Sequence, residues 1–141
     1  MRRLGIALAL ILGAVLIASP ALTATIDDIR VWRAPDHTRL VLDVSEPFKY
    51  STFELDNPER IVVDIIDATL KSSTDVALTN TPIKAIRSGV RAERNLRLVL
   101  DLTEQVRLEV FTLSATEVSG DRLVIDLFDL EPKPRVVASQ P

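Results

Sequence analysis

The 141-residue sequence contains no cysteine, a single histidine (His37) and only 4% aromatic residues. Without cysteine the chain forms no disulfide and has no thiolate nucleophile, cysteine-ligated zinc or iron–sulfur cluster. One histidine leaves little room for a Ser-His-Asp triad or for a catalytic zinc, which takes three protein ligands. We therefore expect no chemistry from this chain alone, no cofactor, and no catalytic or metal-binding residue.

Positive charge is also scarce, because 17 Lys and Arg residues stand against 20 Asp and Glu residues and the net charge is −3. Nucleic-acid binding depends on an excess of Lys and Arg, so nucleic acid is not an expected partner. Glycine is rare as well, since only Gly89 and Gly120 occur beyond residue 24. Two isolated glycines do not build a phosphate-binding loop.

The N-terminus accounts for part of the 47% hydrophobic content. Two arginines precede an uncharged, mostly apolar run over residues 4–18, and small residues follow it. This layout is typical of a secretory signal peptide over residues 1–24, for which cleavage after Ala21 and cleavage after Ala24 both fit. At about 1.5 Å per residue the run is short for a hydrocarbon core of about 30 Å, so we expect no retained membrane anchor.

A repeated pattern organises the rest of the sequence. Four segments read Arg-x-Val-x-Asp with a larger aliphatic residue at each x: Arg39–Asp43, Arg60–Asp64, Arg97–Asp101 and Arg122–Asp126. The alternation has a period of two residues and is rich in β-branched side chains, which predicts strands. Their aliphatic face is expected in the core, and the face with Arg, Val and Asp is expected outside.

The repeat extends into an internal duplication, because residues 39–55 align with 97–113 without a gap. We interpret residues 25–130 as one domain with halves of about 25–68 and 82–130. A polar connector joins the halves and could hold a short strand around residues 76–78. Each half supplies four expected strands, at 26–33, 38–46, 48–55 and 60–67, and at 83–91, 95–103, 106–114 and 121–129.

Eight strands with two-fold sequence symmetry predict an all-β fold, a β-sandwich of two symmetrical four-stranded sheets. From Glu131 the pattern stops, and residues 131–141 are interpreted as a Pro-containing linker or tail.

One run of the first half resembles a known family. Tyr50 to Ile65, with its core Leu-Asp-Asn-Pro-Glu-Arg-Ile-Val-Val-Asp, is similar to the signature of the AMIN domain, and Val31-Trp32 and residues 83–90 fit the same pattern. This domain is the N-terminal module of periplasmic N-acetylmuramoyl-L-alanine amidases of the AmiC type and occurs also in type IV pilus secretins. The resemblance covers about residues 26–130.

The resemblance implies a symmetrical two-sheet β-sandwich that binds peptidoglycan in the periplasm and directs an attached enzyme to the division septum. Division or envelope proteins are further partners that it implies. Three functions stay open. The chain is a non-catalytic peptidoglycan-binding module without its zinc catalytic domain, a protein-interaction domain of an envelope assembly such as a secretin, or part of an amidase whose chain continues past Pro141.

A peptidoglycan binder needs flat aromatic faces for sugar rings and guanidinium groups for carboxylates. Trp32 has no aromatic counterpart in the second half and is either a stacking residue at the rim or a plug at the edge of the sandwich. Arg33, Arg91 and Arg94 have no Asp partner at strand spacing, which makes them the preferred ligand candidates.

Arg39 and Arg97 complete the candidate set, although the repeated Arg and Asp also favour ion pairs on a solvated face. Within the first half, Arg39 is expected near Asp64, and each sheet face is expected to hold equal numbers of both charges. Phe53 and Phe111 occupy equivalent repeat positions and are expected in the core. The valines of the repeat are expected as an exposed row. The predicted peptidoglycan-binding residues are thus Trp32, Arg33, Arg39, Arg91, Arg94 and Arg97.

Overall fold

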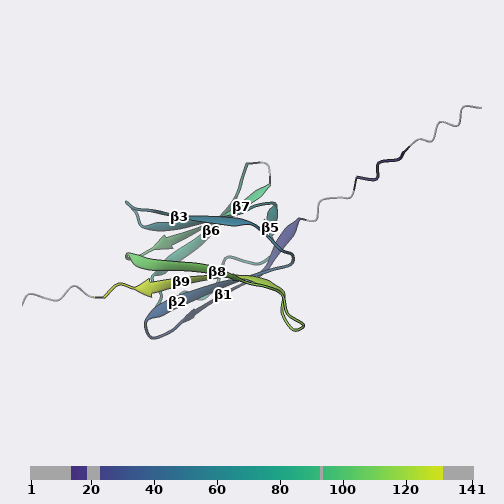
Figure 1. Ribbon diagram of the computed structural model, residues 1–141. Coiled ribbons are helices and arrows are strands. Elements are labelled where there is room, and N and C mark those ends of the chain that lie inside the picture. Colours follow the sequence, from purple (N-terminus) through teal and green to yellow (C-terminus); the bar gives the residue numbers. More distant parts are fainter. Residues whose placement is uncertain (1–13, 19–22, 93, 132–141) are drawn as a thin grey trace, which may run out of the picture.

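The computed structural model describes residues 14–18, 23–92 and 94–131. Nine strands between Ala24 and Asp129 form two layers packed face to face (Figure 1). The strands are β1 (Ala24–Arg33), β2 (His37–Val44), β3 (Tyr50–Leu55), β4 (Arg60–Ile65), β5 (Ala68–Leu70), β6 (Ile83–Arg91), β7 (Asn95–Leu102), β8 (Val106–Leu113) and β9 (Asp121–Asp129). The predicted fold class, an all-β sandwich, is confirmed.

Most of the predicted signal peptide, and all but the first residue of the predicted tail, lie outside the described residues. Within the described part of the chain, no helix has the length and apolarity that a membrane crossing requires.

One layer has five strands in the order β5-β1-β2-β9-β8, and the other has four in the order β3-β4-β7-β6. The fifth strand is β5, which pairs in parallel with the first three residues of β1 and was not predicted. Three residues are too few to show a period of two. The short strand expected around residues 76–78 is wrong, because Val76 and Leu78 lie in irregular chain and pack against the core.

The two halves of the duplication interlock. Each sheet joins one hairpin from each half: β1 and β2 pair with β9 and β8, while β3 and β4 pair with β7 and β6. The central neighbours are therefore β2 with β9 and β4 with β7, and both pairs are antiparallel. Thus β2 pairs with β9, which is the counterpart of β4, and β4 pairs with β7, which is the counterpart of β2. The expected pairing of Arg39 with Asp64 is therefore wrong.

The core lies between the sheets and consists of the aliphatic positions of the repeat. Leu40, Leu42, Leu98, Leu100 and their counterparts on β4 and β9 are at most 1% exposed. Because side chains alternate across a strand, burial of these positions turns every Arg, Val and Asp of the repeat to the two outer faces. The charged side chains of the repeat are therefore carried on these outer faces.

Candidate functional site

The outer faces of the two sheets carry the same arrangement of side chains. Across the five-stranded sheet, cross-strand pairing forms the row Arg30, Val41, Val124 and Phe111. Across the four-stranded sheet, it forms the equivalent row Arg87, Val99, Val62 and Phe53. The duplication thus yields two related surfaces on opposite sides of the molecule.

Next to each row lies an ion pair whose guanidinium lies over the ring of the phenylalanine in that row. Arg39 donates through Nε and Nη2 to both carboxylate oxygens of Asp126, at 2.8 Å each, and its guanidinium carbon is 5.7 Å from the ring centre of Phe111. On the opposite face Arg97 does the same toward Asp64, at 2.7 Å each, and lies 5.4 Å from the ring centre of Phe53. Two parallel hydrogen bonds fix the plane of each guanidinium, so both groups are held in place before any ligand arrives.

A second ion pair lies on the other side of each row. Arg30 binds Asp43 in the same two-bond geometry, at 3.0 and 2.9 Å. Arg87 binds Asp101 at 2.6 and 2.9 Å, and these hydrogen bonds hold the pKa of the Asp101 carboxyl below its ordinary value. Of the repeated arginines, Arg39 and Arg97 therefore form ion pairs on the outer faces, with carboxylates on strands that the sequence did not identify as neighbours. The repeated Asp43 and Asp101 pair instead with Arg30 and Arg87, which lie outside the four repeat segments.

The expectation that Phe53 and Phe111 lie in the core is wrong, since they are 39% and 37% exposed. Each pairs with a valine of the repeat, Phe53 with Val62 and Phe111 with Val124, and so points outward. The expected exposed row of valines is wrong as well, because Val62 and Val124 are at most 3% exposed. Valine is short, and the longer aromatic and guanidinium side chains beside it cover it.

Trp32 lies on the outer face of the five-stranded sheet, opposite Arg39 on the neighbouring strand. It is 43% exposed, and the guanidinium carbon of Arg30 is 6.0 Å from its ring centre. Its counterpart on the other face is Gly89, which lies opposite Arg97. Trp32 is thus a partly exposed surface residue, and its ligand role stays a prediction.

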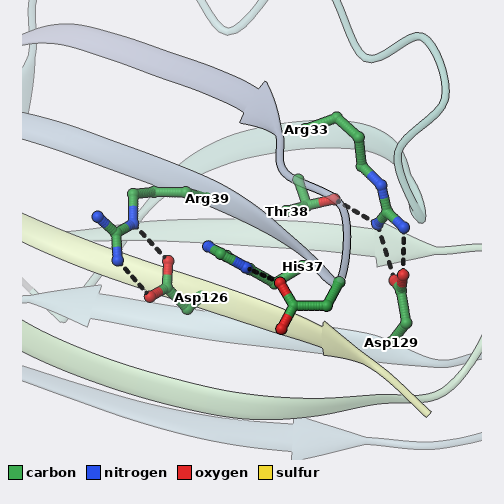
Figure 2. A network of polar contacts seen from close by, with 7 residues as sticks. Arg33, His37, Thr38, Arg39, Asp126 and Asp129 are labelled. Carbon is green, nitrogen blue, oxygen red and sulfur yellow. Dashed lines mark hydrogen bonds and ion pairs between the residues drawn. The ribbon is translucent and has the colours of Figure 1, made fainter. Parts of the chain in front are cut away.

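Arg33 does have a carboxylate partner, contrary to the reasoning that singled it out. Figure 2 shows its guanidinium directed at both carboxylate oxygens of Asp129, and Nη1 also donates to Thr38 Oγ1 at 3.2 Å. The contact holds the pKa of the Asp129 carboxyl below its ordinary value. Asp129 ends β9, 96 residues further along the chain, so strand spacing could not reveal the pair.

The same region holds a cluster that the sequence analysis missed. The ring of His37 stacks on Phe128, with ring centres 4.9 Å apart, and its Nδ1 lies 2.7 Å from a carboxylate oxygen of Asp36. The guanidinium carbon of Arg107 lies 4.3 Å from the ring centre of Phe128. The sequence offered one signal for this cluster, the aromatic residue Phe128 just after the last repeat segment. The register of β2 with β9 then places Phe128 opposite the lone histidine, His37.

Arg91 and Arg94 lie at the opposite end of the sandwich. Arg91 ends β6, and the carbonyl of Arg94 accepts a hydrogen bond from the amide of Ala68, which pairs with the start of β1. Arg33 ends that ten-residue strand, about 30 Å away at about 3.3 Å per residue. The six predicted binding residues therefore do not form one site.

Two of the predicted residues meet on each face. On the five-stranded sheet, Trp32 lies beside Arg39. On the other sheet, Arg91 lies near the ion pair of Arg97 with Asp64, and its charge lowers the pKa of the Asp64 carboxyl. Arg97 has the largest effect on that pKa through its hydrogen bonds. Arg33 and Arg94 lie at the two ends of the sandwich. Among residues 14–18, 23–92 and 94–131, no three His, Asp or Glu side chains gather as metal ligands.

Fold and surface define a class, a pseudo-symmetric β-sandwich module with aromatic and guanidinium groups on both outer faces. The chain belongs to the AMIN domain family, which matches residues 28–127 and confirms the resemblance found in the sequence.

Two curated relatives are both named N-acetylmuramoyl-L-alanine amidase AmiC. The protein of Neisseria meningitidis serogroup B is 36% identical over 117 residues, which cover 79% of this chain and 27% of the relative. The protein of Escherichia coli O6:H1 is 34% identical over 105 residues, which cover 71% of this chain and 25% of the relative. The chain thus spans about a quarter of the length of the curated relatives that it matches.

Proposed function

We propose that this chain is a periplasmic peptidoglycan-binding module that directs an N-acetylmuramoyl-L-alanine amidase to the division septum. Family membership and the names of the two relatives support the link to peptidoglycan, since the bond named in them belongs to that polymer. The shared segment covers about a quarter of each relative. We assign binding to this module and hydrolysis to the remaining part of such an amidase.

The observation that carries the proposal is the surface formed by Trp32, Arg39 and Phe111. Trp32 and Phe111 are 43% and 37% exposed, and the guanidinium between them is held flat by its two bonds to Asp126. Sugar rings stack on flat apolar side chains, and planar guanidinium groups recognise carboxylates. One face therefore carries both aromatic rings that can stack on sugars and a guanidinium that can bind a carboxylate.

Co-sedimentation with purified sacculi tests this binding. The sandwich closes its core within residues 24–129, so a chain that lacks residues 1–21 keeps every core residue. We expect it to pellet with sacculi, and we expect Trp32→Ala to weaken the binding several-fold. Val118→Ala, at a residue that is 94% exposed in the loop between β8 and β9, is the matched control and is expected to bind as the parent chain does. Absence of sedimentation at every salt concentration would refute peptidoglycan binding.

The targeting part of the proposal needs a separate test in cells. A fluorescent protein fused after residue 141 and exported with this chain is expected to concentrate at the septum of dividing cells. If a chain that binds sacculi gives a uniform periplasmic signal, septal targeting is refuted and the proposal of peptidoglycan binding is unaffected.

A second candidate function is protein interaction in an envelope assembly such as a pilus secretin, and the free edge of β8 favours it. This eight-residue strand is the last one of its sheet and contains no proline, so its outer backbone groups can pair with a strand of another protein. Site-specific crosslinking from Thr112 in cells tests it. A crosslink to an envelope protein, together with no binding to sacculi, would favour this function over peptidoglycan binding.

A further inference from the structure

The two outer faces differ in charge although they share one pattern. On the five-stranded sheet, cross-strand register places four arginines and four carboxylates on the outer face: Arg30, Arg39, Arg107 and Arg122, with Asp28, Asp43, Glu109 and Asp126. On the four-stranded sheet, it places four arginines with only two carboxylates: Arg60, Arg87, Arg91 and Arg97, with Asp64 and Asp101. The expected charge balance therefore holds on the first face and fails on the second, which we call the cationic face.

The surplus charge surrounds both carboxylates of the cationic face. The pKa of Asp101 is lowered mainly by its hydrogen bonds with Arg87, and the charges of Arg60 and Lys84 lower it further. Asp64 is influenced in the same way by Arg97 and then by Arg91. Each carboxylate thus has more than one cation beside it, so the ion pairs leave positive charge for a ligand on a chain whose net charge is negative.

The cationic face is also open where the other face is covered. Gly89 lies opposite Arg97, at the position that Trp32 occupies opposite Arg39. A Cβ atom added at Gly89 would meet no other atom within 4 Å. A ligand can therefore approach the backbone of β6 closely and reach Arg97 on one side and Arg91 on the other.

We propose that the cationic face binds the carboxylates of the peptide stems of peptidoglycan through Arg91 and Arg97 beside Gly89, while the Trp32 face binds the glycan. The proposal rests on the proposed function and assigns different parts of one polymer to the two faces.

Two observations favour a carboxylate-bearing peptide over a sugar on the cationic face. The only aromatic ring in its cross-strand rows is Phe53, which lies on the far strand β3, and Arg97 lies over that ring. Arg87 and Arg97 already hold carboxylates in the planar two-bond geometry. A further carboxylate of an extended peptide can bind the remaining guanidinium N–H groups in the same plane.

The test uses the two parts of the polymer as separate probes. The ¹⁵N-labelled chain without residues 1–21 is titrated with free stem peptides released from sacculi by an amidase, and separately with the peptide-free glycan strands. We expect the peptides to shift the amide resonances of Gly89, Arg91 and Arg97, and the glycan to shift the indole N–H of Trp32. Peptide shifts confined to the Trp32 face, or no shifts at all, would overturn the inference.

Matched variants separate charge from shape. Gly89→Glu and Gly89→Gln differ only in one negative charge at a position with free space, so we expect the first to weaken peptide binding at least five-fold relative to the second. Arg91→Gln is expected to weaken it about two- to five-fold, the size of one exposed charge contact. Arg107→Gln makes the same charge change on the other face and is expected to leave peptide binding unchanged.

The outcomes also distinguish this inference from the proposed function. Equal peptide binding by Gly89→Glu and Gly89→Gln would overturn the role of the cationic face even if sacculi still bind. Binding of the cationic face to vesicles of phosphatidylglycerol, with no binding of stem peptides, would replace the peptide by a lipid and overturn the inference too. Failure to bind sacculi at all would overturn the proposed function itself.

Discussion

Arg39 and Asp126 face each other on β2 and β9, 87 residues apart in the sequence and in opposite halves of the duplication. Their two hydrogen bonds of 2.8 Å join the halves across the centre of one sheet, as Arg97 and Asp64 do across the other. The repeat therefore encodes the joining of the two halves as well as the strands themselves. Its Arg and Asp stand at positions where each half completes the ion pairs of the other.

Loss of the Asp126 carboxylate is expected to destabilise the fold. The side chain is only 3% exposed, and its removal leaves the guanidinium of Arg39 without its partner in a half-buried position. We expect Asp126→Asn to lower the free energy of unfolding by about 1–3 kcal/mol, measured by urea denaturation. Glu109→Gln removes a carboxylate from a pair that is half exposed, and we expect a change within about 0.5 kcal/mol. Equal effects of the two substitutions would contradict this account.

The acid side of the stability profile follows from three carboxylates. Asp64, Asp101 and Asp129 all have a folded-state pKa below the ordinary value, in each case mainly because of hydrogen bonds from an arginine. A lowered pKa means that these groups stabilise the folded state above their unfolded pKa, near 4, and that this contribution is lost as the pH falls through the folded pKa. We therefore expect the urea midpoint to be level above about pH 5 and to fall steeply below about pH 4.

Substitution of these carboxylates gives the control for the pH profile. The double variant Asp64→Asn, Asp101→Asn lacks two of the carboxylates whose pKa differs between the folded and the unfolded state. Because their ion pairs are lost, its urea midpoint is expected to be lower at pH 7. Because these two groups no longer titrate, the midpoint is also expected to depend less on pH between 4 and 2. A parallel decline of parent and variant would show that other groups govern the loss of stability in acid.

Strand positions were predictable from the sequence, and strand partners were not. The alternation of aliphatic and polar residues identified all eight long strands to within about two residues at each end, because burial of one face enforces a period of two. The pattern is the same in all four repeat segments, so it does not say which segment pairs with which. The choice of Asp126 over Asp64 for Arg39 depends on long-range topology.

The candidate site was predictable only in part for the same reason. Trp32 and Arg39 were both in the predicted set, and the structure places them on neighbouring strands, while their ligand role stays a prediction. Phe111 was placed in the core because it repeats in the sequence, yet in a two-faced sandwich a repeated residue can equally be a repeated surface residue. Its register partner Val124, on the strand beside it, fixes the outer side.

Export is expected to leave Leu22 as the first residue of the mature chain. Ala24 is 4% exposed, its amide donates to the carbonyl of Asp67 at 3.0 Å, and it begins the parallel pairing with β5. Cleavage after Ala24 would remove these contacts and place a charged amino group at Thr25. Mass spectrometry of the exported protein measures the difference, and a mature chain that begins at Thr25 would contradict the prediction.

The interlocked halves are expected to fold only together. A fragment of residues 22–80 contains β1 to β5 but lacks β9 and β7, the strands that pair with β2 and β4, so the backbone of β2 and of β4 loses its partner and each layer covers only part of the core. We expect this fragment and a fragment of residues 81–141 each to lack the far-UV circular dichroism of the sandwich, and an equimolar mixture to recover it as a 1:1 complex in size-exclusion chromatography. Because the halves are related in sequence, the first fragment can also form a homodimer that competes with the 1:1 complex. In this homodimer Arg39 would pair with Asp64 of the second copy in place of Asp126. A monomeric, fully structured single fragment would contradict the interlocked topology as the source of stability.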